Sequence, residues 1–266
     1  MFSVVVPTYG RPQFLSEALE SVRSQRLEDW ECIVVDDASP DPVTVPDDPR
    51  VRVVRRSVNG GAAAARNTGI EEATGEVVCF LDDDDLYTPE RLELAAEGLE
   101  RAPITVCWSR WLNGPEEPQR ILEGNVHKII AEAITPHLGV TAVKRDVLPH
   151  FNERFRTVQD IEWWIRATET LPVATVPKFG YLVRRHPGDR TGYGAEQRIN
   201  DSHLLMQTHR DYFAATPRAR AFRWRRIGLM SRKIGDTATA RRAFLRALRT
   251  RPDPRDAKHL LTSLRR

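Results

Sequence analysis

The chain has 266 residues, 41% of them hydrophobic, so it is long enough to form one large α/β domain with a sizeable core and a smaller appended part. No apolar stretch approaches the roughly 18 to 20 residues of a membrane-spanning helix, and no basic flank precedes the first strand-like run, so we expect no membrane span, no signal peptide and a cytoplasmic location. The net charge of +3 conceals an asymmetry, since residues 217–266 contain 16 Lys and Arg against 3 Asp and Glu.

Short β-branched runs alternate with longer amphipathic stretches over the first hundred residues, a pattern typical of βαβ units around a mostly parallel sheet. The predicted strands are 2–6, 30–35, 51–55 and 76–81, and the predicted helices are 12–26, 62–73 and 89–99. Polar residues follow the first, second and fourth strands, and open α/β sheets bind ligands beyond the carboxyl ends of their strands. We therefore expect these loops to meet at one site.

The second half of the chain is less regular. A strand is predicted at 104–112 and a helix around 160–167, and from about residue 199 onward only helical patterns occur, with a hairpin of helices at 220–234 and 237–249 that Pro252 ends. We predict an α/β domain over residues 1–195, followed by a basic, α-helical C-terminal extension over residues 196–266.

Four consecutive aspartates follow the fourth predicted strand, and like charges this close repel each other unless a cation neutralises them. Alternate residues of an extended segment point the same way, so Asp82 and Asp84 would face one Mn²⁺ or Mg²⁺. Asp83 would face a donor sugar or ribose, and Asp85 would be structural. The alternative is a solvated acidic turn that caps a helix beginning near Pro89.

The loops after the first two strands carry groups that suit a nucleoside. Residues 7–11 offer a hydroxyl, an aromatic ring and a cation, and Asp36 and Asp37 offer carboxylates that can accept hydrogen bonds from a ring N–H and a ribose hydroxyl. Neither a Walker lysine motif nor G-x-G-x-x-G follows the first strand, which argues against a P-loop nucleotidase and a dinucleotide-binding dehydrogenase.

Four segments of the chain resemble family 2 glycosyltransferases of GT-A fold in their residues, order and spacing. These segments are 4–12 (VVVPTYGRP), 34–40 (VVDDASP), 59–69 (NGGAAAARNTG) and 80–85 (FLDDDD). The resemblance covers about residues 1–190 and implies a nucleotide-sugar donor, most often a UDP-sugar, and a metal that bridges its diphosphate. By position it implies nucleotide contacts from Pro7, Thr8, Tyr9, Arg11, Asp36, Asp37, Asn59, Arg66 and Asp83, and metal contacts from Asp84 with Asp82 close by.

Inverting members of this family use a carboxylate base, usually the aspartate of a Glu-Asp pair that opens a helix. By resemblance this base is Asp160, with Gln159 where the family usually has Glu. Asp160 could instead be an N-cap of the predicted helix. Residues 181–190 resemble the family's Tyr-Arg-x-His segment, which implies that His186 reaches the metal or the diphosphate and that Arg190 reaches the diphosphate. The alternatives are that His186 is only a turn residue and that Arg190 pairs with surface acids.

The arginine-rich C-terminal helices could lie on an anionic membrane surface, where a lipid-linked acceptor would be found, form a homodimer or face solvent. Nucleic acid is not an expected partner. The predicted function is therefore metal-dependent, inverting transfer of a sugar from a nucleotide diphosphate donor, by resemblance a UDP-sugar, to a carbohydrate, lipid-linked or small-molecule acceptor. The alternatives are a donor-binding or scaffold protein that has lost activity, and a sugar nucleotidyltransferase, which usually needs a Gly-rich basic loop after the first strand.

Overall fold

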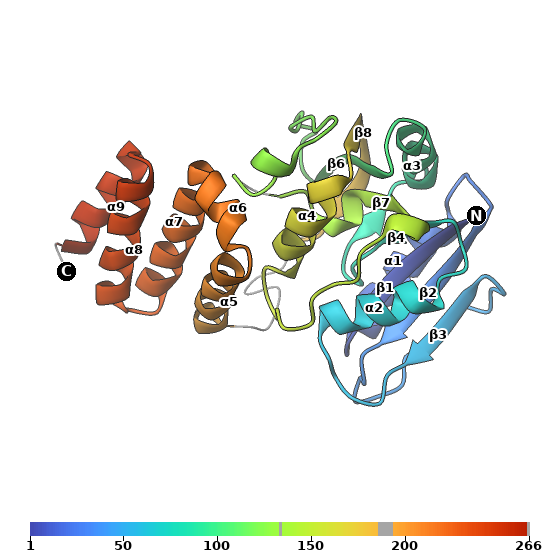
Figure 1. Cartoon of the computed structure of the whole chain (residues 1–266). Coiled ribbons are helices and arrows are strands. Elements are labelled where there is room, and N and C mark those ends of the chain that lie inside the picture. The colour runs from blue at the N-terminus through green and yellow to red at the C-terminus, as the bar shows by residue number, and fades with distance from the viewer. Residues whose placement is uncertain (133–134, 186–193, 265–266) are drawn as a thin grey trace. The chain divides into compact units, whose positions relative to one another are not determined.

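The computed structural model describes residues 1–132, 135–185 and 194–264, which form two compact units (Figure 1). We call Met1–Val126, Pro136–Glu153 and Arg166–Pro187 the sheet unit, and His127–Thr135, Arg154–Ile165 and Gly188–Arg266 the helical unit. Among the described residues, no helix is both long enough and apolar enough to cross a membrane.

The sheet unit is built on one eight-stranded sheet. Its strands are β1 (Phe2–Thr8), β2 (Trp30–Asp36), β3 (Val51–Arg55), β4 (Val77–Phe80), β5 (Leu86–Tyr87), β6 (Ile104–Trp111), β7 (Thr141–Lys144) and β8 (Val173–Val183), in the order β3-β2-β1-β4-β7-β6-β8-β5. The first four strands of this order are parallel, and β7 runs antiparallel to both of its neighbours. Every residue of β1 is buried, as expected of a central parallel strand that is covered on both faces.

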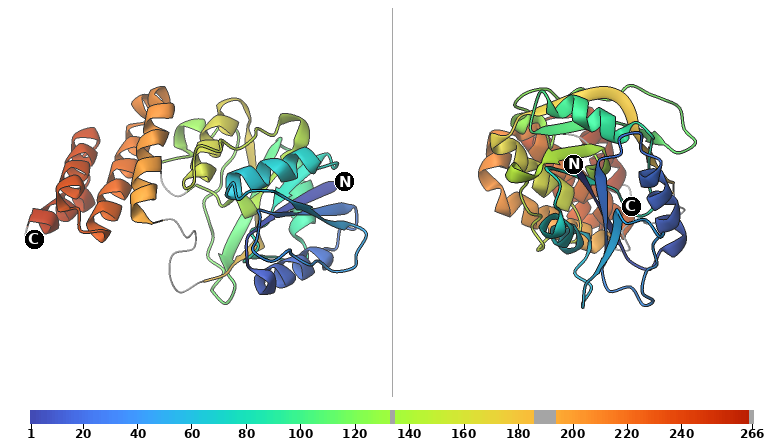
Figure 2. Two further views of the ribbon diagram at one scale, coloured as in Figure 1. Left: turned by 90° about the horizontal axis from the view of Figure 1, so that it is seen from below. Right: turned by 90° about the vertical axis from the view of Figure 1, so that its right-hand side faces the viewer.

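Helices cover the two faces of this parallel half. Figure 2 shows α1 (Pro12–Arg23) on one side of β1–β3 and α2 (Ala62–Glu72) on the other. A Cβ at Gly69 of α2 would lie 2.2 Å from the Val5 side chain of β1, so the glycine allows the helix to approach the strand closely. The other helical segments of the sheet unit are α3 (Arg91–Leu99), the 3₁₀ turns η2 (Leu138–Val140) and η3 (Arg145–Val147), and the second half of α4 (Gln159–Thr170).

The first strand is longer than its sequence predicts. The expected strand ends at Val6 because Pro7 follows it, whereas β1 continues to Thr8 and Pro7 lies opposite Val35 of β2. The backbone N–H and C=O groups of successive β1 residues point alternately toward β2 and toward β4. The nitrogen of Pro7 points to the β4 side, beyond the last residue pair of β1 and β4, Val5 with Phe80. The missing N–H of proline therefore costs no ladder hydrogen bond.

Among its described residues, the helical unit contains the first half of α4 and five further helices. These are α5 (Ala195–Thr208), α6 (Arg210–Ala215), α7 (Pro217–Lys233), α8 (Thr237–Thr250) and α9 (Pro254–Leu264). The 3₁₀ turn η1 (His127–Ile129) also belongs to this unit. The predicted hairpin is confirmed as α7 and α8, with Gly235 at φ 81° in the turn and the Asp236 carboxylate accepting a hydrogen bond from the Thr239 N–H at 2.9 Å.

Candidate functional site

The loops that follow β1 and β4 meet at the carboxyl end of the sheet, because the two strands are parallel neighbours. The Thr8 hydroxyl, which is 3% exposed, donates a hydrogen bond to Asp83 Oδ2 at 2.7 Å. Arg11 Nη1 lies 2.9 Å from Asp84 Oδ2 and 3.5 Å from Asp83 Oδ1. Tyr9 between them is 50% exposed. The expected convergence of these two loops is therefore present.

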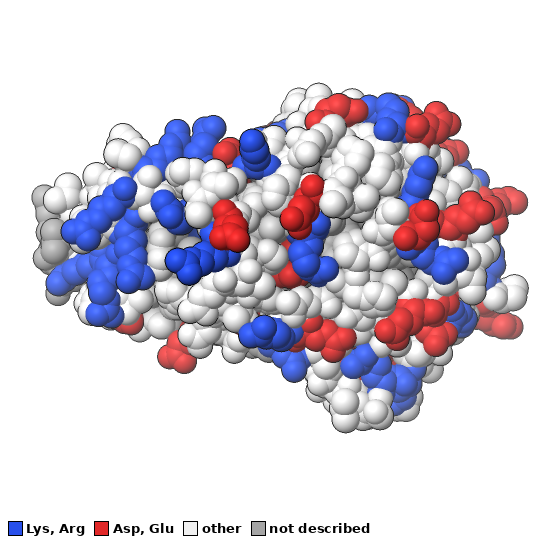
Figure 3. Space-filling view, in the orientation of Figure 1, with Lys and Arg blue, Asp and Glu red and all other residues white. Residues whose placement is uncertain are grey.

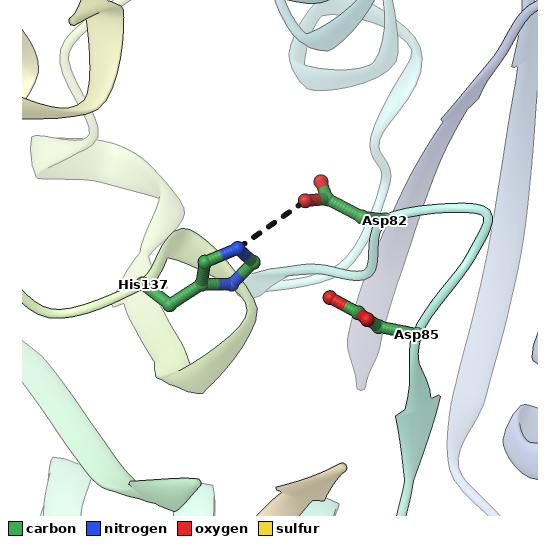
Figure 4. Close-up of side chains that lie close together, drawn as sticks. All are labelled: Asp82, Asp85 and His137. Atoms are coloured by element: carbon green, nitrogen blue, oxygen red, sulfur yellow. Dashed lines mark ion pairs between the residues drawn. The ribbon is translucent and has the colours of Figure 1, made fainter. Parts of the chain in front are cut away.

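The prediction that alternate aspartates face the same way assumes an extended segment, but the four aspartates do not continue the strand. They form a turn in which the Asp85 N–H donates to the Asp82 carbonyl at 3.1 Å, and the first and fourth residues of such a turn lie close together. Ligand atoms of Asp82, Asp85 and His137 all lie within 4.8 Å of one another. Figure 4 shows these three side chains pointing toward one point, with His137 Nε2 3.4 Å from Asp82 Oδ2.

Tyr181 of β8 forms hydrogen bonds with two aspartates of this cluster. Its hydroxyl donates to Asp85 Oδ2 at 3.0 Å, and the Asp82 N–H approaches the same hydroxyl oxygen at 3.4 Å. A Cβ at Gly139 would lie 2.0 Å from the Tyr181 ring, so only glycine allows η2, which follows His137, to pack against this ring. Burial raises the pKa of Tyr181 well above its ordinary value, and the charges of Asp82 and Asp85 add to this increase, so the hydroxyl remains a donor.

Arginines surround the acidic loop. Arg66 of α2 is 4% exposed and its Nη2 donates to Asp82 Oδ1 at 2.7 Å, while its buried Nε and Nη1 have no hydrogen-bond partner among the described residues. The Arg184 N–H donates to Asp85 Oδ1 at 2.7 Å. Burial raises the pKa of Asp83 to about 6, opposed by the Thr8 hydrogen bond and by Arg11. The loop therefore combines excess negative charge with a buried guanidinium that has donors to spare.

Asp36 and Asp37, at the end of β2, hold the loop after this strand and the loop that begins α2. Asp36 is fully buried, accepts a hydrogen bond from the Ser39 N–H at 2.9 Å and pairs with Arg55. Asp37 accepts from the Gly60 and Gly61 N–H groups at 3.0 and 2.7 Å, and it thereby holds the loop that begins α2. Asn59 in that loop is exposed. Arg56 Nε also lies 2.9 Å from Asp37 Oδ1. Because a carboxylate has about four lone-pair positions, Asp37 keeps the capacity for one further donor.

The candidate base lies in the helical unit. Asp160 is half-buried in the first turn of α4, two residues after Val158, whose φ is 50°. Two other predicted site residues, His186 and Arg190, lie outside the described residues.

Sequence reasoning missed His137 as a member of the acidic cluster. It lies 52 residues beyond Asp85 in a stretch without a regular pattern, and its position depends on the close packing of Gly139 against Tyr181. The signal that could have found it is the Pro-His-x-Gly sequence at 136–139, which is too short to be specific.

Among solved structures, TarS of Staphylococcus aureus in complex with UDP-GlcNAc is similar, with a TM-score of 0.70 and 20% identity, over 97% of this chain and 83% of that chain. The mannosyltransferase PcManGT of Pyrobaculum calidifontis, in complex with GDP-Man and Mn²⁺, gives a TM-score of 0.60 at 23% identity over 99% and 79% of the two chains. At these identities the likeness shows a shared GT-A fold, as the sequence predicts.

Curated relatives resemble this chain over part of their length. An uncharacterised protein of Sinorhizobium fredii, y4gI, is 33% identical over 71% of this chain and 23% of its own length. The putative colanic acid biosynthesis glycosyl transferase WcaA of Escherichia coli is 39% identical over 35% of this chain and 36% of its own. The chain thus spans well under two thirds of these relatives. The sequence model of the family described as "Glycosyl transferase family 2" matches residues 3–157, more than half of the chain. The chain therefore belongs to glycosyltransferase family 2.

Proposed function

We propose that this protein transfers a sugar from a nucleoside diphosphate donor to an acceptor hydroxyl, with inversion at the anomeric carbon. The observation that carries the proposal is the meeting of the loops after β1 and β4, in which Thr8 and Arg11 bind the acidic turn of Asp83 and Asp84. This is the position at which open α/β sheets bind their ligands. Membership of glycosyltransferase family 2 supplies the reaction class.

A uridine nucleotide is the donor that we propose first. The exposed ring of Tyr9 offers a face for a base, and Asp37, in the loop after the neighbouring strand β2, would accept a hydrogen bond from a ring N–H. TarS binds UDP-GlcNAc and PcManGT binds GDP-Man, so the two structural neighbours differ in nucleotide and both nucleotides enter the test.

We propose that the acidic turn holds Mn²⁺ or Mg²⁺ when the donor binds. Carboxylate oxygens are the ligands that both ions prefer, and the burial and mutual repulsion of these carboxylates favour a cation. Asp82 and Asp84 are the ligands that the family resemblance implies, and the geometry offers Asp82 with Asp85 and His137. Bound metal would offset the negative charge of the diphosphate as it leaves.

The protein's own groups would do the rest of the chemistry. Asp160 would accept the proton of the acceptor hydroxyl while that oxygen attacks the anomeric carbon and the bond from this carbon to the diphosphate breaks. The spare donors of Arg66 lie beside the acidic turn and would bind diphosphate oxygens as their charge develops.

Nucleotide and metal binding can be tested without knowing the acceptor. UDP with Mn²⁺ should raise the melting temperature more than GDP with Mn²⁺, and UDP-GlcNAc and GDP-Man should follow the same order, because a ligand that binds only the folded state stabilises it. Asp84→Ala should abolish the increase that depends on Mn²⁺. The matched control Asp41→Ala removes an exposed carboxylate from the loop after β2 and should leave it unchanged. Equal stabilisation of the wild type and Asp84→Ala would refute the role of Asp84.

The base is tested by Asp160→Asn, which keeps the shape of the side chain and removes its basicity. We expect release of nucleoside diphosphate from the bound nucleotide sugar to fall by about 10² to 10⁴-fold, the usual contribution of a general base, with donor binding unchanged. Turnover within twofold of the wild type would remove Asp160 from the mechanism.

A further inference from the structure

The backbone that presents Asp160 is strained directly before the helix. Val158 has φ 50°, in the left-handed region that β-branched residues rarely adopt, and α4 begins with the next residue. Such a conformation is unfavourable for a β-branched residue and persists only where the surroundings hold it. Contacts made by the residues before Val158 therefore help to fix the position of the first turn of α4, and with it the position of Asp160.

Asp201 of α5 makes those contacts. Its side chain is 2% exposed, and its Oδ2 accepts hydrogen bonds from the Arg156 N–H at 3.0 Å, the Thr157 N–H at 2.6 Å and the Thr157 hydroxyl at 2.8 Å. Its other oxygen accepts from Gln197 at 2.8 Å on the same helix. Hydrogen bonds from backbone N–H groups to a buried carboxylate are short and strong, so Asp201 fixes the two residues that precede the strained one.

Two more contacts connect this part of α4 to the C-terminal helices. Glu162, which is 1% exposed, lies with its Oε1 3.3 Å from His209 Nε2 at the junction of α5 and α6. Arg223 of α7 is 3% exposed, and within the part of the chain that the structure describes its Nε and Nη2 have no hydrogen-bond partner. Burial lowers the pKa of Arg223 to about 10, and the charge of the nearby Asp160 opposes this effect. Asp160 thus has a buried cation near it.

We infer that the C-terminal helices position the catalytic base, with Asp201 as the positioning residue that holds the start of α4 and thereby the Asp160 carboxylate. This inference rests on the proposed function, because it gives Asp160 the role of base. It assigns the region after residue 195 a part in the reaction rather than only in surface contacts. Misplacement of a reacting group by about 1 Å can lower the rate by 10²-fold, so the hydrogen bonds of Asp201 matter for turnover.

The test compares Asp201→Ala and Asp201→Asn with Ser202→Ala. Ser202 is the next residue of α5, is equally buried, and its hydroxyl donates to the Arg198 carbonyl of the same helix. The readout is release of UDP from UDP-GlcNAc or of GDP from GDP-Man, whichever nucleotide sugar the protein turns over. We expect kcat to fall on the order of 10²-fold in Asp201→Ala, with the dissociation constant of the nucleotide unchanged and Ser202→Ala like the wild type.

A purely structural role of Asp201 would show in a different way. Because Asp201 acts through Asp160, adding Asp201→Ala to Asp160→Asn should lower the residual rate by less than twofold. A further loss of about 10²-fold in the double variant, or a folded Asp201→Ala with wild-type kcat, overturns the inference. If Asp201→Ala does not fold, Asp201→Asn, which keeps one acceptor oxygen, gives the same comparison. Normal turnover of Asp160→Asn alone would overturn the proposed base first, so the two failures are distinguishable.

Discussion

Two buried tyrosines of the sheet unit have different hydrogen-bond partners. The Tyr181 hydroxyl donates to the carboxylate of the fully buried Asp85, whereas the Tyr87 hydroxyl donates to the Phe80 carbonyl at 2.7 Å. Their rings pack edge to face, with centroids 5.9 Å apart. Tyr181 thus contacts the acidic cluster as well as the core, whereas the Tyr87 hydroxyl donates to a backbone carbonyl, so a comparison of the two tyrosines distinguishes the two roles.

Tyr181→Phe should therefore weaken the site as well as the fold. It removes the donor to Asp85 Oδ2, which costs about 1 to 3 kcal/mol, and weakens the hold on the buried carboxylate, whose Oδ1 still accepts from the Arg184 N–H. We expect a lower melting temperature together with weaker binding of UDP and Mn²⁺ in calorimetric titration. Tyr87→Phe is the control and should lower the melting temperature alone. Equal nucleotide affinity in both variants would contradict a role of Tyr181 in the cluster.

Which site residues the sequence can predict depends on how they are placed. Thr8, Arg11 and the aspartates lie directly after strands whose periodicity is clear, so the rule for parallel sheets brings them together. The direction of each aspartate follows instead from a turn that a run of identical residues does not reveal. His137 and Tyr181 lie 52 and 96 residues beyond Asp85, and only tertiary packing brings them to it.

At the scale of elements, the predicted boundaries are good where a local signal ends an element. The third strand is found at its predicted bounds, 51–55, and the predicted helical hairpin is found as α7 and α8. The sequence pattern does not predict the last helix, α9, because the predicted hairpin ends at Pro252. Pro254 instead occupies the first turn of a new helix, where its missing N–H has no cost.

The contact that holds α9 is a buried ion pair. Arg225 of α7 binds Asp256 of α9, which is 0% exposed, with its Nη2 2.7 Å from Asp256 Oδ2 and 2.8 Å from Asp253 Oδ2. The hydrogen bonds to Asp256 raise the pKa of Arg225 above its ordinary value. When Asp256 is removed, Arg225 keeps only the partly exposed Asp253 as a partner, so part of its sheltered charge is left uncompensated.

Asp256→Ala should detach α9 without unfolding the sheet unit. Breaking a buried pair costs about 3 to 5 kcal/mol, so amide exchange in α9 should become faster by two orders of magnitude or more. Arg255→Ala is the control, because Arg255 pairs with Asp253 at the surface and such pairs contribute little, about 0 to 1 kcal/mol. Peptide-resolved hydrogen exchange measures both variants. Unchanged protection of α9 in Asp256→Ala would show that apolar packing holds this helix instead.

At the scale of the whole molecule, positive charge is concentrated on the C-terminal helices. Figure 3 shows Lys and Arg gathered over α7, α8 and α9 on the face in view. Exposed members of this basic surface are Arg226, Arg242, Arg246, Arg249 and Arg251. The charge count of residues 217–266 predicts this surface from the sequence, but not which of its arginines are buried, as Arg223 and Arg225 largely are.

We expect the basic surface to bind anionic membranes, where a lipid-linked acceptor would be found. Each Lys or Arg near an anionic surface contributes about 1 kcal/mol, so Arg242→Gln, Arg246→Gln and Arg249→Gln together should lower binding by about two orders of magnitude. The control replaces the exposed Arg120, Lys144 and Lys178 of the sheet unit by Gln. The measurement is sedimentation with phosphatidylserine vesicles at low salt, repeated at about 1 M salt, where screening reduces the Debye length to about 3 Å and binding should vanish. No sedimentation at low salt, or equal loss in both triple variants, would contradict the prediction and leave these arginines as a solvated surface.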